Sequence, residues 1–162
     1  MKFQLFDIEI STPNDWRIRI TESSNYEDGK MAIISPKKLY IAIRWQNVKS
    51  IKKQGIFSLK DYVEEVFSKP KDRKIKDVKL LENVGYKKDD HEYRFIRVNF
   101  VYKKLFSQPK PQEYMGFLIL CKKLNRLIGA FTNYPLGVIE ENVKYLEEPL
   151  KSIVCKCNYI NY

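Results

Sequence analysis

The first part of the chain places apolar residues at every second position, which is the period of a β-strand with one buried face. Phe6, Ile8 and Ile10 alternate with acidic residues, and Trp16, Ile18 and Ile20 alternate with arginines. Two further apolar runs follow before residue 46. Ser, Pro, Asn, Asp and Gly separate these runs, so the pattern predicts a meander or two hairpins. The predicted strands cover residues 6–10, 16–20, 31–35 and 39–45.

The apolar spacing changes to three and four residues after Ser58, which predicts an amphipathic helix. Ser58 is the predicted N-cap, and Asp61 in the first turn complements the exposed backbone amides. Pro70 ends the helix because proline cannot continue it. The apolar face of this helix consists of Leu59, Tyr62, Val63, Val66 and Phe67.

Strand patterns return after this helix, and a second helix closes the chain. A phase slip near residues 96–97 predicts a β-bulge. A helical pattern runs from about Leu136 to Val154, and Pro149 inside it predicts a kink or a division into two helices. The predicted strands cover residues 78–84, 92–102, 114–120 and 127–132.

This order of elements predicts an α+β fold in one domain. A length of 162 residues is typical of a single domain. An antiparallel sheet has to cover at least one apolar face, and the two amphipathic helices are sufficient for that. An alternative architecture places the terminal helix across one curved sheet, around a ligand cavity.

Two segments resemble the PsbP-like fold family. Residues 12–18, Thr-Pro-Asn-Asp-Trp-Arg-Ile, are similar to its early signature of a proline, a turn and a tryptophan. Residues 127–132 and the helix ending at residues 150–154 are similar to its closing strand and helix. The order of elements agrees across nearly the whole chain. Cys155 and Lys156 replace the serine–aromatic pair often seen after that helix.

The resemblance implies an α/β/α sandwich with a central antiparallel sheet, one helix mid-chain and a kinked C-terminal helix. Residues 1–162 would then form a single PsbP-like domain. The family includes the photosystem extrinsic protein PsbP, a nuclear import factor that binds the GTPase Ran, and uncharacterised prokaryotic proteins. It shares no catalytic residue, so the resemblance transfers none, and fold alone does not give function.

The chain is strongly basic, with 30 Lys and Arg against 20 Asp and Glu and a net charge of +10. A basic surface favours an acidic partner such as an acidic protein face or nucleic acid. Lys greatly outnumbers Arg, which weakens the case for nucleic acid because Arg is the better phosphate ligand. Abundant Lys, Glu, Ile and Tyr with few Gly also resemble the composition of a thermophile or of an AT-rich genome.

Basic residues gather before and after the first predicted helix, and these form the predicted binding site. A solubilising surface accounts for them equally well. Aromatic and basic residues also alternate at Tyr93-Arg94-Phe95 and Tyr102-Lys103, as in stacking platforms for single-stranded nucleic acid. An ordinary strand with one buried face is the favoured interpretation there. The predicted binding residues are Lys49, Lys52, Lys53, Lys69, Lys71, Arg73, Lys74 and Lys76.

The chain has three cysteines, Cys121, Cys155 and Cys157, and one histidine, His91. An odd number of cysteines does not match a secreted disulfide framework, so reduced thiols are expected, although either of the last two could pair with Cys121. Zinc sites usually space cysteines two to four apart and need four ligands, and His91 is far away in sequence. We therefore predict no metal site, no cofactor, and a solvated turn at residues 89–92.

The sequence favours a non-enzymatic binding or adaptor protein with an acidic protein partner. No phosphate-binding glycine loop is present, and no nucleophile has a predicted base, so no catalytic residue is assigned. Non-specific nucleic-acid binding through the Lys-rich loops around the first helix is the alternative. A metal-dependent enzyme or hydrolase around His91 is less favoured. No signal peptide or membrane span is predicted, so the expected location is the cytoplasm.

Overall fold

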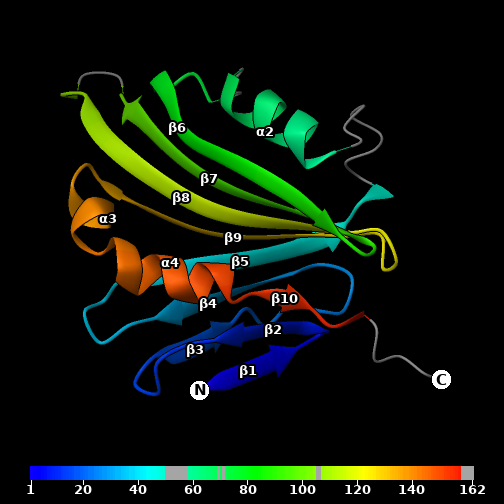
Figure 1. Ribbon diagram of the computed structural model, residues 1–162. Coiled ribbons are helices and arrows are strands. Elements are labelled where there is room, and N and C mark those ends of the chain that lie inside the picture. The colour runs from blue at the N-terminus through cyan, green and yellow to red at the C-terminus, as the bar shows by residue number, and fades with distance from the viewer. Residues whose placement is uncertain (50–57, 69, 71, 105–106, 158–162) are drawn as a thin grey trace.

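The computed structural model describes residues 1–49, 58–68, 70, 72–104 and 107–157 (Figure 1). Within these residues, the main sheet has seven strands, and every neighbouring pair is antiparallel. Their spatial order is β3 (Arg17–Ile20), β4 (Gly29–Ile34), β5 (Tyr40–Asn47), β9 (Arg126–Pro135), β8 (Lys110–Cys121), β7 (His91–Tyr102) and β6 (Ile75–Lys88).

A small second sheet and three helices complete the described fold. The small sheet has the order β1 (Lys2–Leu5), β2 (Ile8–Ser11) and β10 (Val154–Cys155). The helices are α2 (Leu59–Ser68), α3 (Val138–Glu141) and α4 (Val143–Lys151). Figure 1 shows α2 on one face of the main sheet and α3, α4 and the small sheet on the other. The predicted α+β sandwich around an antiparallel sheet is confirmed.

Each face of the main sheet buries its own apolar cluster. The larger cluster joins the sheet to α4 and the small sheet, and it includes Ile43, Leu146 and Ile8. In the smaller cluster, Leu59 and Val63 of α2 pack against β7, β8 and β9. Leu146 and Leu150 of α4 are fully buried in the larger cluster, so the terminal helix packs on the sheet through its apolar face.

Gly29 and Trp45 show why one position on β4 has to be glycine. They face each other across the β4–β5 pair, and a Cβ atom on Gly29 would lie 2.1 Å from the indole Cζ2 of Trp45. Trp45 is only 2% exposed, and its indole N–H donates a 2.8 Å hydrogen bond to the Asn25 carbonyl. The indole is therefore fixed, so a larger residue at position 29 would displace it.

The predicted strand at residues 6–10 is wrong in its first part. The chain instead forms a hairpin between β1 and β2, and its turn is at Phe6 and Asp7. Both residues have left-handed backbone angles, with φ of 47° and 62°. Phenylalanine rarely adopts this conformation, so the residue type gives no turn signal here. Contacts from distant residues favour the turn, because the Tyr26 hydroxyl donates to Asp7 Oδ2 at 2.5 Å.

The C-terminal segment divides into two helices as predicted, but the division is at Asn142 and not at Pro149. Pro149 lies in the last turn of α4, so the one hydrogen bond lost through its missing N–H is close to the end of the helix. The prediction that the helix continues to Val154 is wrong. Val154 and Cys155 instead form β10, which pairs with Glu9 and Ile8 of β2.

Two local predictions have different outcomes. Ser58 is the predicted N-cap of α2, and its Oγ accepts a 3.1 Å hydrogen bond from the Asp61 amide. The predicted bulge at residues 96–97 of β7 is on the neighbouring strand instead. The register of β6 shifts between Leu80 and Glu82, which pair with Val98 and Arg97. β7 itself keeps a regular register with β8. Its phase slip arises because Phe95 packs in the larger apolar cluster and Ile96 in the smaller one, on opposite faces of the sheet.

A buried carboxylate of the sheet holds the start of α3, and its loss is expected to destabilise the protein. Glu113 is 5% exposed, and its Oε2 accepts a 2.8 Å hydrogen bond from the Ile139 amide. We expect Glu113→Ala to lower the free energy of unfolding by about 2 kcal/mol, because the amide loses its partner in a buried place. The matched control is Glu141→Ala, an exposed glutamate of α3, with an expected change within about 0.5 kcal/mol. Urea denaturation measures both, and equal stabilities would contradict the role of Glu113.

Candidate functional site

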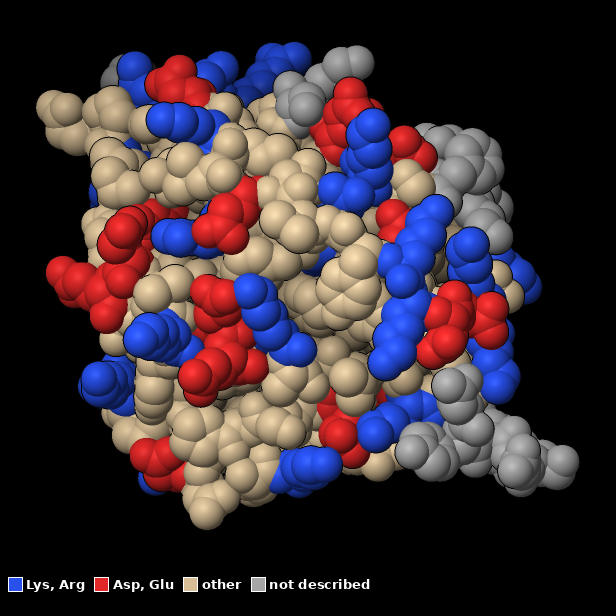
Figure 2. Space-filling model, viewed as in Figure 1, with Lys and Arg blue, Asp and Glu red and all other residues tan. Residues whose placement is uncertain are grey.

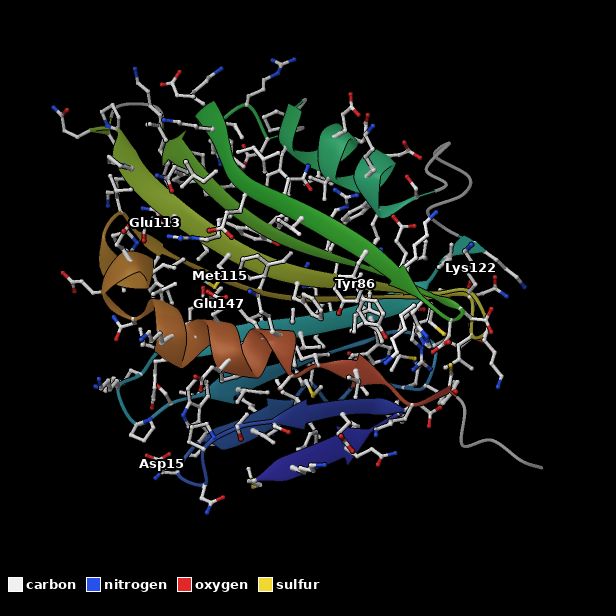
Figure 3. All side chains as sticks on the ribbon, viewed as in Figure 1. Asp15, Tyr86, Glu113, Met115, Lys122 and Glu147 are labelled. Atoms are coloured by element: carbon white, nitrogen blue, oxygen red, sulfur yellow. The ribbon has the colours of Figure 1, made fainter. Side chains whose placement is uncertain are left out.

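Four potential ligand side chains meet at one end of the main sheet. They are His91, Cys121, Cys155 and Cys157, and their ligand atoms all lie within 4.8 Å of one another. We call this group the Cys3His cluster. Figure 3 shows Lys122, the residue after Cys121, at the end of the sheet where β6 and β8 reach their turns. The chain has no further cysteine or histidine, so the cluster contains all of both types.

Strand register brings the four side chains together. His91 is the first residue of β7 and Cys121 is the last residue of β8, and the two are directly opposite in the ladder. Cys155 ends β10, which pairs with β2 of the small sheet. Cys157 follows two positions later, where the chain has left the extended conformation of β10. Three segments far apart in sequence therefore converge on one point.

The cluster is buried and its members contact each other. His91 is 5% exposed and Cys121 and Cys157 are fully buried. Cys157 Sγ lies 3.3 Å from His91 Nε2. The Leu124 amide, in the turn after β8, donates a hydrogen bond of 3.4 Å to Cys121 Sγ. Buried polar groups need such partners, and here the partners are mainly the other members of the cluster.

The three thiols differ in their tendency to ionise. The hydrogen bond from the Cys155 thiol is the main cause that lowers the pKa of Cys121, to about 5. That same hydrogen bond, together with burial, raises the pKa of Cys155. Burial raises the pKa of Cys157 to about 11. Cys121 is therefore the thiol that loses its proton first, and thiolate is the form that binds metals and reacts.

The sequence predicted no metal site because Cys155 and Cys157 are too closely spaced and His91 is remote. The structure removes the second reason, since the β7–β8 ladder places His91 opposite Cys121. The predicted solvated turn at residues 89–92 is correct for Asp89 and Asp90, which are exposed. His91 and Glu92 are instead buried, and Glu92 Oε1 accepts a 3.1 Å hydrogen bond from the Leu59 amide at the start of α2.

The predicted basic residues do not gather at one place. Lys49 follows β5 at the end of the sheet that holds the Cys3His cluster, where the Val48 amide donates to the Asn125 carbonyl at 2.7 Å. Arg73, Lys74 and Lys76 lie at the opposite end, at the start of β6. The β7 strand between the two ends spans twelve residues, or roughly 35 Å. Outside the described residues lie Lys52, Lys53, Lys69 and Lys71.

The start of β6 belongs to a larger basic surface that the sequence does not reveal. Ile75 of β6 pairs with Tyr102 of β7, which in turn pairs with Lys110 of β8. Figure 2 shows Lys and Arg side chains along the top of the molecule, over the starts of β6 and β8. All six side chains are exposed. This surface, the basic edge, consists of Arg73, Lys74, Lys76, Lys103, Lys104 and Lys110.

The aromatic residues between basic residues on β7 are core residues. Tyr93 is 9% exposed and Phe95 is 5% exposed, and both belong to the larger apolar cluster. Their faces are therefore not available to stack on bases, and the favoured interpretation of an ordinary strand is confirmed. Among the described residues, no helix is long and apolar enough to span a membrane.

No protein-family model and no curated protein matches the chain. Among solved structures, the solution structure of cyanobacterial PsbP (CyanoP) from Synechocystis sp. PCC 6803 is similar with a TM-score of 0.67. The match covers 96% of this chain and 91% of that chain. The fold is PsbP-like. Sequence identity is 8%, so the likeness establishes the fold and transfers no residue or activity.

Proposed function

We propose that the protein is a non-enzymatic binding protein that engages an acidic protein partner through the basic edge. The observation that carries this proposal is the convergence of six exposed basic side chains on three adjacent strand ends. The Lys103 amide donates a 2.8 Å hydrogen bond to the Lys74 carbonyl, which holds the two chain segments side by side. The proposal supplies a defined place for the positive charge that the sequence carries in excess.

The charges of the basic edge have few local partners. Asp72 and Asp77 are the acidic residues that flank Arg73, Lys74 and Lys76 in the sequence. Among the described residues, no acidic side chain forms an ion pair with any member of the basic edge. Unpaired charges of one sign steer an oppositely charged partner and set the orientation in which it docks.

A protein partner is favoured over nucleic acid by the chemistry of this surface. Five of its six members are Lys and only Arg73 is Arg, whereas bidentate phosphate recognition depends on Arg. Burial of Tyr93 and Phe95 also puts the faces of these two rings out of reach of single-stranded nucleic acid. An odd number of cysteines does not match a secreted disulfide framework, which supports the cytoplasm as the location in this proposal.

Charge reversal on the basic edge is expected to abolish partner binding. In the triple variant Lys74→Glu, Lys103→Glu and Lys110→Glu, we expect recovery of an acidic protein from native extract to fall by roughly tenfold or more. The matched control is the triple variant Lys30→Glu, Lys60→Glu and Lys144→Glu, three exposed lysines elsewhere with the same change in net charge. It should retain the partner.

Affinity capture with and without nuclease measures how much partner each of the two triple variants recovers. Recovery that survives nuclease, falls with the first triple and persists with the control supports the proposal. Equal losses in both triples would show a response to net charge alone. Recovery that disappears after nuclease treatment would replace the protein partner by nucleic acid, and either result contradicts the proposal.

A further inference from the structure

We propose that His91, Cys121, Cys155 and Cys157 form a tetrahedral site for one Zn²⁺ ion. Three thiolates and one imidazole are a ligand set that structural zinc sites use. Soft sulfur ligands also disfavour magnesium and calcium, which take oxygen ligands. The proposal concerns the end of the sheet opposite the basic edge, and it does not depend on the proposed function.

The distances between donor atoms are those of a nearly formed site. With zinc–sulfur bonds near 2.3 Å, the ligand atoms of a tetrahedral site lie roughly 3.5–3.8 Å apart. Here every separation in the cluster is below 4.8 Å, and Cys157 Sγ is 3.3 Å from His91 Nε2. Only small side-chain adjustments are therefore needed for all four atoms to share one ion.

The convergence itself favours a ligand. All three cysteines and the only histidine of the chain come together from three separate segments. A buried imidazole costs free energy unless its ring nitrogens have partners, and a bound ion would be such a partner for His91. A disulfide between Cys121 and Cys155 would leave Cys157 and His91 without a role, whereas a zinc ion uses all four residues.

The surroundings suit a zinc–thiolate centre. The Leu124 amide already donates to Cys121 Sγ, and such outer hydrogen bonds orient and stabilise ligating groups. Three thiolates and one Zn²⁺ leave a net charge of −1. Lys122 and Lys123, in the turn after β8, supply positive charge beside it.

The proposed site is closed and structural. Four protein ligands fill the usual coordination number of zinc and leave no position for water or substrate. The ion would join β10 of the small sheet to β7 and β8 of the main sheet. It would therefore hold the C-terminal segment against the sheet, which agrees with a binding protein that has no catalytic centre.

Metal analysis of the full chain, purified with a phosphine reductant, tests the proposal. We expect one zinc per chain by mass spectrometry of the metal content. Replacement of zinc by Co²⁺ should give the visible absorption of a tetrahedral ion together with a sulfur-to-cobalt charge-transfer band. Cys121→Ser and Cys157→Ser should each lose zinc and that spectrum. His91→Cys keeps four ligands, so it should retain zinc and shift the cobalt spectrum.

A matched control separates this site from a surface site. Asp89 and Asp90 are exposed carboxylates next to His91, so the double variant Asp89→Asn and Asp90→Asn should retain zinc. Circular dichroism on every variant shows whether it is folded. Zinc that persists in both serine variants, or that disappears from the aspartate variant, would overturn the proposal. Wild-type protein with three titratable thiols that takes up no added zinc would also overturn it.

Discussion

Removal of zinc is expected to lower the melting temperature of the protein by roughly 10 °C. A ligand that binds only the folded state, at about a thousand times its Kd, adds about 4 kcal/mol of stability. In a chain of this length, each kcal/mol of stability changes the melting temperature by roughly 2–4 °C. The Cys3His cluster would not exist in the unfolded chain, so the binding free energy of the ion contributes directly to folding. Thermal unfolding with and without a strong chelator measures the change.

The double variant Cys121→Ser and Cys157→Ser is the control for this experiment. It lacks two of the four ligands, so its melting temperature should be low at the start and should not respond to the chelator. After removal of the chelator, added zinc should restore the melting temperature of the wild-type protein but leave that of the variant unchanged. A wild-type melting temperature that is insensitive to the chelator would contradict a structural zinc.

Arg126→Met is expected to cost about 3 kcal/mol of the free energy of unfolding. Arg126 is 2% exposed and pairs with Cys121 across the β8–β9 ladder. Its guanidinium donates to the carbonyls of Phe6 and Tyr26 and lies 4.1 Å from the centroid of the Tyr26 ring. Methionine fills similar space but leaves both carbonyls without a donor, at about 1–3 kcal/mol each, and removal of a buried charge offsets part of this.

Arg44→Met is the matched control. Arg44 also lies over an aromatic ring, 5.6 Å from the centroid of Phe131, but its side chain is exposed. Its substitution should change the free energy of unfolding by less than about 1 kcal/mol. The free energies of unfolding of the two variants, measured by urea denaturation, should therefore differ clearly. Equal losses would show that the hydrogen bonds of Arg126 to the two loops contribute little.

The elements with strong periodicity could be predicted from the sequence. The pattern of α2 and its cap at Ser58 depends on neighbours within four residues, so local residue types are sufficient to specify it. The same holds for the alternating strands. The turn at Phe6 and Asp7 depends instead on Tyr26 and Arg126, which are remote in sequence, and local chemistry gave no sign of it.

The Cys3His cluster was missed because it depends on strand register. His91 and Cys121 are equally distant from the middle of the β7–β8 connection, so a regular hairpin would place them opposite each other. The sequence alone therefore contains enough information to predict that His91 and Cys121 lie opposite each other. The approach of Cys155 and Cys157 to this pair could not be predicted, because it requires the chain to leave α4 and pair with β2. The predicted helix to Val154 hid that pairing.

The basic surface shows the same limitation. Arg73, Lys74 and Lys76 are neighbours in sequence and were predicted together. Lys103 and Lys110 join them only because β6, β7 and β8 align their ends in space. Lys49 was grouped with them by its distance from the same helix, and the length of the strands places it at the other end of the sheet.

X-ray absorption at the zinc edge of the native protein tests the central claim most directly, because it reports the atoms bound to the ion. The Cys3His cluster predicts three sulfur atoms at about 2.3 Å and one nitrogen at about 2.0 Å. A shell of oxygen and nitrogen atoms only would contradict the claim, because the zinc would then be bound elsewhere on the surface. Native protein without a zinc edge would contradict it as well.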